Sequence, residues 1–245
     1  VVGINLELGI HEWSEAMQDA GANLTIGGSF VSKYQEKELI SAKDSLGHPI
    51  LEIKPEGKYD YYYNLPAWVG AGSARAQLQI KGWNALVEYA YKANDPTVLN
   101  DYSYKHGEAL LLSISYSKKG MAIMAQAKRS ENMSFRSDRQ ASLMKGTINH
   151  MPPFATQHTY MLASLYPYGT EKTANEWAFQ GEIRYTWKRG TAMGGRYGTT
   201  LKLNASHIRG TGEKWFAMTE EPYYTDVNLE LNKKINKQWY IGAMA

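Results

Sequence analysis

Residues 107–130 constrain this chain more than any other stretch, because they contain two long alternating runs joined by a short turn. Every second residue from Leu110 to Tyr116 is large and apolar, and Ser113, Ser115 and Ser117 fall on the other face. A second alternating run follows the turn at Lys118-Lys119-Gly120. Alternation on both sides of a glycine-containing turn predicts a β-hairpin. Strands of about ten residues have the length that a tilted strand needs to cross a bilayer.

The two faces of this hairpin differ in a way that is unusual for a soluble sheet. One face is apolar, and the other carries small and polar side chains. The wall of a membrane barrel, with lipid outside and a wet interior, shows this pattern. Similar alternation predicts further strands at 1–10, 22–31, 74–80, 83–91, 140–149, 158–167, 177–187, 199–206, 227–231 and 239–243.

Short turns and longer polar loops alternate along the chain. The short turns are at 81–82, 118–120, 188–190 and 233–237, and the longer loops are at 93–106, 131–139, 168–176 and 209–222. Counting strands places every clear short turn at one end of the sheet, together with the connections 11–20 and 150–157. The long insertion at about 32–72 falls at the other end. Bacterial outer-membrane barrels have this arrangement, with the short turns on the periplasmic side.

The sequence therefore predicts a single all-β domain over residues 1–245. We expect an antiparallel transmembrane β-barrel of about twelve strands, with an extracellular insertion at about 32–72. A soluble sandwich or propeller is the alternative, but its strands would be closer to five or six residues long. The 18 Tyr and 7 Trp, against 5 Phe, favour the barrel, since Tyr and Trp collect at membrane interfaces.

Composition argues against several kinds of site and partner. The chain has no Cys, which excludes disulfides and thiolate metal sites. Its net charge of +3 is too balanced to indicate a nucleic-acid partner. The six histidines include no pair at metal-ligand spacing, so we expect no metal and no other cofactor. The carboxylates of Asp95, Asp101, Glu220 and Glu221 fall in predicted outer loops and are interpreted as solvated charges.

Four stretches carry a family resemblance. They are residues 113–139, 157–168, 194–198 and 201–206. These stretches are similar to an uncharacterised family of Bacteroidota outer-membrane β-barrel proteins. The resemblance implies a barrel fold and an integral location in a bacterial outer membrane, and the family has no known activity to carry over to this chain. The members of that family are longer than this chain, so the resemblance also implies a segment of a larger barrel.

The face opposite the apolar one supplies candidate functional residues. In a closed barrel this face lines the interior, and the lining candidates are Arg75, Gln77, Glu88, Lys128, Glu182, Arg184, Lys202 and Asn204. In an open lumen, the four cations of this set would produce a weak preference for anions. In a barrel without an open lumen, the same groups would pair with one another. The sequence leaves both arrangements open.

The densest aromatic patch lies in the long insertion and is a candidate binding surface. It consists of Tyr59, Tyr61, Tyr62, Tyr63 and Trp68. These rings could stack on sugars as part of a surface glycan site. They could also form the upper aromatic girdle and pack the insertion over the barrel mouth, and this interpretation is favoured because girdles are expected in every such barrel.

The predicted function is a non-catalytic outer-membrane barrel that acts as a pore or as a barrel subunit of an envelope complex. Its expected partners are outer-membrane lipid and other envelope proteins. A barrel that captures glycan or a partner protein through its long loops is the alternative. An outer-membrane hydrolase is disfavoured, because Asn204 and Ser206 share one face of a strand and His207 points to the other.

Overall fold

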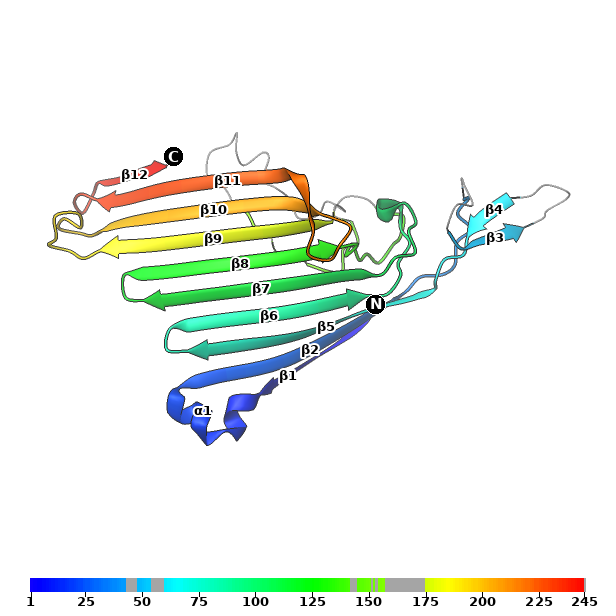
Figure 1. Ribbon diagram of the computed structural model, residues 1–245, viewed down its shortest axis with the longest axis horizontal. Helices are drawn as coiled ribbons and strands as arrows, with labels where there is room; N and C mark the ends of the chain where they lie inside the picture. The colour runs from blue at the N-terminus through cyan, green and yellow to red at the C-terminus, as the bar shows by residue number, and fades with distance from the viewer. Residues whose placement is uncertain are drawn as a thin grey trace.

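A computed structural model describes residues 1–42, 48–53, 60–141, 145–150, 152, 154–156 and 175–244. Ten strands form one antiparallel sheet in the order β1-β2-β5-β6-β7-β8-β9-β10-β11-β12 (Figure 1). The predicted all-β, antiparallel class is therefore confirmed. Within the described residues the sheet is open rather than closed into a barrel, because β1 and β12 each pair with one neighbour only.

Most strands of the large sheet are ten or more residues long. They are β1 (Val2–Gly9), β2 (Ala22–Tyr34), β5 (Trp68–Ile80), β6 (Trp83–Lys92), β7 (Gly107–Lys118), β8 (Met121–Glu131), β9 (Glu176–Trp187), β10 (Thr199–Thr211), β11 (Met218–Lys234) and β12 (Tyr240–Met244). A separate hairpin pairs β3 (Ile50–Ile53) with β4 (Asp60–Tyr63). The described helical segments are η1 (Ile10–Trp13), α1 (Glu15–Ala20) and η2 (Val98–Asn100).

The hairpin predicted at 107–130 is the pair β7–β8, and its turn is one residue shorter than predicted, because Lys118 belongs to β7. Lys118 pairs with Met121 across the turn, and the ladder continues to Glu108 and Glu131. The neighbouring β5–β6 turn has positive φ at both Lys81 and Gly82. Positive φ at both central residues is typical of a type I′ turn, whose twist matches the twist of the flanking strands.

The predicted separation of short and long connections holds from β2 to β8 but fails beyond β9. The predicted short turn at 188–190 is a longer connection over 188–198, and the predicted long loop at 209–222 is reduced to 212–217 because β10 and β11 extend into it. The short-turn end holds η1 with α1 and the turns that follow β5 and β7, whereas the connections that follow β2, β6 and β8 start and end at the long-loop end (Figure 1). The insertion is shorter than the expected 32–72, because β2 and β5 pair as far as Tyr34 and Trp68.

The prediction of a strand at 140–149 is wrong. Residues 140–141 and 145–149 form turns and loop, with one isolated bridge between Arg136 and Thr147. The prediction at 158–167 lies outside the described residues. Because β8 pairs directly with β9, their connection starts and ends at the long-loop end. The placement of 150–157 with the short turns is therefore also wrong.

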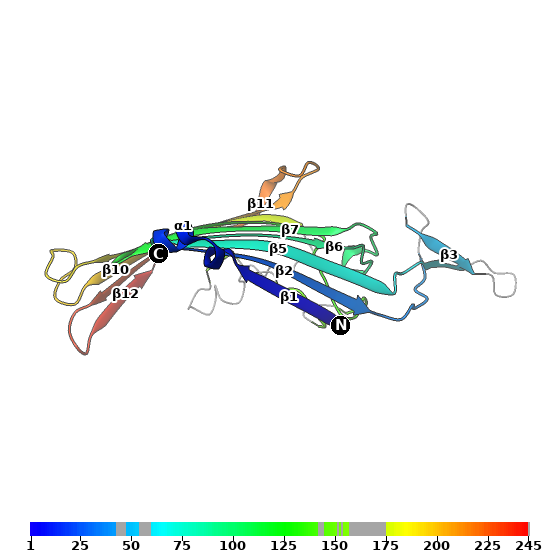
Figure 2. The same cartoon turned by 90° about the horizontal axis from the view of Figure 1, so that it is seen from below.

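The core of the described chain lies against the polar face of the sheet, near the long-loop end. Its tightest cluster consists of Phe154 against Ala178 of β9 and Ile208 of β10. The opposite, apolar face is mostly exposed, and Leu6 and Ile114 keep 64% and 47% of their surface. Figure 2 shows the sheet as a thin curved layer, with the start of β11 rising from one side of it. A soluble sheet normally buries its apolar face and exposes its polar face. In this sheet the apolar face is exposed and the polar face is partly covered.

Candidate functional site

The apolar face forms an uncharged belt along the strands. Within the described strands, charged residues on this face lie only near strand ends; on β7 these are Glu108 and Lys118. The ten steps along the chain from Glu108 to Lys118 rise about 33 Å along the strand. A tilt of about 40° reduces this to roughly 25 Å, which is the height of the apolar band of outer-membrane barrels.

Aromatic side chains collect at both margins of this belt. At the long-loop end, the rings of Tyr34 and Trp68 lie 4.9 Å apart. At the short-turn end, the rings of Trp83 and Tyr116 lie 4.8 Å apart. Amphipathic aromatic rings at two levels resemble the girdles that flank a membrane band.

A charged cluster closes the belt at the long-loop end. The guanidinium of Arg129 contacts the carboxylates of Glu108 and Glu131, at 3.0 and 2.5 Å. It also donates a hydrogen bond to the carbonyl oxygen of Trp215, at 2.9 Å, and lies 4.8 Å from the ring of that residue. The connection between β10 and β11 therefore folds over the apolar face only at its margin.

All eight lining candidates lie on the polar face, as their alternation predicts. Arg75, Glu88 and Lys128 share one row across the sheet. The remaining candidates lie in the rows nearer the short-turn end; they are Gln77, Glu182, Arg184, Lys202 and Asn204. The structure thus brings the predicted residues to one surface, where they could line a lumen if the sheet closed.

The cations among these candidates are paired with carboxylates. Glu182 lies 3.6 Å from the guanidinium of Arg184 and 3.4 Å from the ammonium of Lys202. Lys128 contacts Glu176 at 2.8 Å, and both side chains are buried. Among the ion pairs of the described residues, only those of Glu182 join two of the predicted lining residues, because Lys128 pairs with Glu176 and Arg75 with Glu7. Whether the lumen is open or closed stays a prediction.

Arg75 reaches across a neighbouring strand to find its carboxylate. Its guanidinium donates hydrogen bonds to Ser29 on β2, at 2.8 Å, and to Asn5 on β1, at 2.7 Å, and it forms an ion pair with Glu7. The side chain crosses Gly27, where an added Cβ would lie 2.9 Å from Nε of Arg75. Gly27 therefore leaves room for this path of the arginine, and a larger residue would push the flexible end of Arg75 aside.

A buried ionic cluster at the long-loop end was not foreseen from the sequence. Lys33 donates hydrogen bonds to Asp95, at 2.8 Å, and to the carbonyl oxygen of Arg136, at 2.6 Å. Both side chains of the ion pair are only 1% exposed, so the interpretation of Asp95 as a solvated charge is wrong. Lys92 donates to the carbonyl oxygen of Ser134, at 2.7 Å. These contacts tie β2 and β6 to two long loops.

The described part of residues 133–152, here called the covering segment, lies over the polar face. Backbone bonds hold it together: the amide of Ile148 donates to the carbonyl of Phe135, at 2.8 Å. The side chain of Asn149 accepts from the amide of Phe135, at 3.0 Å. Lys128 binds it to β8 by donating to the carbonyl of Pro152, at 3.1 Å.

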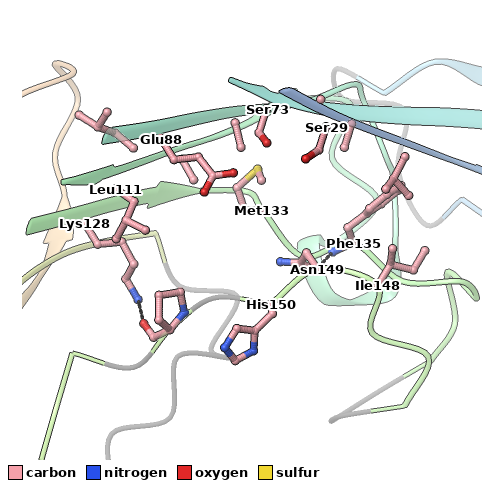
Figure 3. Close-up of a pocket in the computed structure, with 17 residues that line it drawn as sticks. Ser29, Ser73, Glu88, Leu111, Lys128, Met133, Phe135, Ile148, Asn149 and His150 are labelled. Carbon is pink, nitrogen blue, oxygen red and sulfur yellow. Dashed lines mark hydrogen bonds between the residues drawn. The ribbon is translucent and has the colours of Figure 1, made fainter. Parts of the chain in front are cut away.

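A cavity of about 370 Å³ lies between the covering segment and the sheet. Glu88, Ser73 and Ser29 project into it from the strands, and Met133 and Phe135 face them from the covering segment (Figure 3). The walls of this cavity are mostly apolar.

The aromatic candidates of the insertion separate into different environments. Trp68 begins β5 at the margin of the belt, whereas Tyr61, Tyr62 and Tyr63 lie on the hairpin β3–β4, clear of the large sheet (Figure 1). Tyr61 is exposed, and Tyr63 is buried. Tyr59 lies outside the described residues.

Tyr63 packs between loops instead of forming part of a girdle. Its ring stacks on that of Tyr102, with centroids 4.6 Å apart. The hydroxyl of Tyr104 donates to the carbonyl of Asn64, at 2.7 Å. Burial raises the pKa of both Tyr102 and Tyr104 above the ordinary value of 10.0. These tyrosines attach the insertion to the loop that follows β6.

The residues considered for a hydrolase do not converge. Asn204 and Ser206 are buried on the polar face of β10. His207 lies on the other face, where its ring contacts Thr225 at 2.8 Å and Arg209 at 2.8 Å. In the described ranges, no group of three or more His, Asp or Glu residues could hold a metal ion.

A family model matches residues 1–244 of the chain. The chain belongs to DUF6029, a family of unknown function. No curated protein and no solved structure matches this DUF6029 chain. Among its described residues, no helix is long and apolar enough to span a membrane. The resemblance to Bacteroidota outer-membrane proteins stays a prediction.

Proposed function

We propose that this chain forms the wall of an integral β-barrel in a bacterial outer membrane. It has no catalytic role and acts as a pore or as a barrel subunit of an envelope complex. One observation carries the proposal: the apolar face of the ten-stranded sheet is exposed, and the polar face holds the core.

The size of the apolar face argues that something covers it. Ten strands spaced about 4.8 Å apart, over a strand length of about 33 Å, give a face on the order of 1,400 Å². Soluble monomers rarely expose contiguous apolar patches of more than a few hundred Å². An uncovered face of this size would drive association in water.

The pattern at the margins favours lipid over a protein partner. A protein interface has a polar rim on all sides and no fixed height. Here the belt has an estimated height of about 25 Å along β7, close to that of a membrane-barrel band. The rings of Trp68 and Trp83 lie at opposite margins. The Arg129 cluster lies where headgroups would meet the long-loop end.

The polar face favours a narrow or closed interior. The buried pair Lys33–Asp95 and the covering segment fill the long-loop end. Toward the short-turn end, Glu182 pairs with two cations. Between the two forms of the proposal, this filling favours a barrel subunit or a narrow passage over a wide pore.

Single-cysteine spin labelling in lipid vesicles tests the lipid-facing belt directly. The chain has no Cys, so each variant carries one label. We expect labels at Leu112 and Ile114 to be accessible to oxygen, which concentrates in lipid, and labels at Ser113 and Ser115 to be shielded from it. Equal accessibility at the four positions, or higher accessibility to a water-soluble nickel reagent at Ile114, would reject the membrane wall.

Conductance across planar bilayers then distinguishes a pore from a closed barrel subunit of an envelope complex. A narrow passage should give small, steady currents, and a closed subunit should give none. Large currents from the intact chain would show that the covering segment does not obstruct the lumen.

A further inference from the structure

We propose that the cavity under the covering segment is a binding site for a small organic cation with an apolar body, such as an aryl-alkyl ammonium ion. The site is formed by the polar face of the strands β2, β5, β6, β7 and β8 and by the described part of the covering segment (Figure 3). It is independent of what covers the apolar face, because it lies on the other side of the sheet.

A row of small side chains makes the space. Ser29, Ser73, Ala90 and Ala109 are direct neighbours across four strands. Larger residues at these positions would fill the gap between the sheet and the covering segment. The volume of about 370 Å³ is at the lower end of the range for small-molecule sites.

The apolar side chains that line the cavity select a ligand with an apolar body. The covering segment lines the cavity with Phe135, Met133 and Ile148, and the sheet lines it with Val31 and Leu111. An aromatic or aliphatic group would contact apolar atoms on both sides. The covering segment is prearranged for this contact by its backbone bonds, so little ordering entropy is lost on binding.

Glu88 determines the charge of the ligand. Its carboxylate faces the cavity, and among the described residues it has neither a hydrogen bond nor an ion pair. The two cations of its row have other carboxylate partners: Arg75 binds Glu7, and Lys128 binds Glu176. Lys128 and His150 also line the cavity, but the ammonium of Lys128 is held by Glu176 and by the carbonyl oxygen of Pro152. A carboxylate at an apolar cavity gains most from a charged donor, so Glu88 is the group that would bind an ammonium ligand.

The test uses three probes of similar shape and different charge: phenethylammonium, phenethyl alcohol and phenylacetate. Binding to the full chain in detergent micelles is measured by saturation-transfer NMR, with protein-free micelles as background. We expect phenethylammonium to bind at least about tenfold more tightly than phenylacetate, as one charge-assisted hydrogen bond predicts. Equal affinity for the three probes, or no binding, would overturn the proposal.

Two variants and one control locate the binding. Glu88→Gln should abolish the preference for the ammonium probe while phenethyl alcohol still binds. Ala90→Phe, which fills the cavity from its floor, should abolish binding of all probes. Glu230→Gln removes a carboxylate from the same face outside the cavity and should change nothing. A preference that persists in Glu88→Gln would show that another group selects the cation. Failure of the membrane tests above would leave this result unaffected.

Discussion

Replacing Ile114 by arginine should destabilise the protein strongly in a bilayer and hardly at all in water. Ile114 lies near the middle of β7, on the apolar face, and 47% of its surface is exposed. Its cross-strand neighbours are Ala85 and Ala125. Neither neighbour offers a carboxylate or a carbonyl to a long cation, so the guanidinium would face hydrocarbon.

The structure sets the magnitude and a gradient with depth. An arginine on the lipid face of a membrane barrel costs about 2–4 kcal/mol near the bilayer midplane and about 0–1 kcal/mol near its surfaces. Ile114→Arg should therefore lower the free energy of unfolding by about 2–4 kcal/mol, and Tyr116→Arg, one face position nearer the margin, by less. Ser115→Arg is the matched control, because it points to the polar face and should cost little.

Urea unfolding from lipid vesicles, followed by tryptophan fluorescence, measures these differences. Exposed surface substitutions in a soluble protein usually change stability by less than about 0.5 kcal/mol. If Ile114→Arg and Ser115→Arg differ by no more than that, the apolar face is not in contact with lipid and the proposed wall is refuted.

Three further substitutions test contacts on the polar face and in the loops. Gly27→Val should displace the end of the Arg75 side chain, because its Cβ would lie 2.9 Å from Nε of Arg75; it should cost up to about 1 kcal/mol in urea unfolding, the value of a partly exposed ion pair, and adding Arg75→Ala should cause little further loss. Lys33→Met should cost about 3–5 kcal/mol by leaving Asp95 buried and unpaired, whereas the double variant with Asp95→Leu should recover most of the loss. Burial raises the pKa of Tyr104 above 10.0; its contribution to stability is thus complete below that pH and is lost as pH rises through the raised value, and Tyr104→Phe should remove this alkaline loss in a pH series of unfolding curves.

Alternation in the sequence was sufficient to assign most strands and both faces. Leu112 and Ser113, adjacent in sequence, point to opposite faces as predicted, since the side-chain period of a strand is two. The eight lining candidates share one face for the same reason. The predicted ends of the strands were less accurate. β2 and β5 stay paired as far as Tyr34 and Trp68, although the sequence beyond the predicted ends shows no clear alternation.

The segment after β8 shows where local pattern fails. Ile148 belongs to a stretch that the sequence analysis assigned to a strand, but it lines the cavity under the covering segment. An apolar residue in a short alternating run fits a strand and a packed loop equally well. Only the direct pairing of β8 with β9 decides between them, and that pairing depends on residues more than forty positions apart.

The buried ion pairs also join residues that are distant in the sequence, so local pattern could not predict them. A buried pair such as Lys33–Asp95 adds little net stability over apolar residues of similar size, because desolvation offsets the attraction. It does penalise every arrangement that separates the partners. A loop with only apolar side chains could pack against the polar face of the sheet in several positions. The buried ammonium group of Lys33, in contrast, requires the one loop position in which Asp95 can accept its hydrogen bond. The pairs therefore specify which loop meets which strand, and this specificity keeps the cavity at Glu88 open beneath a fixed cover.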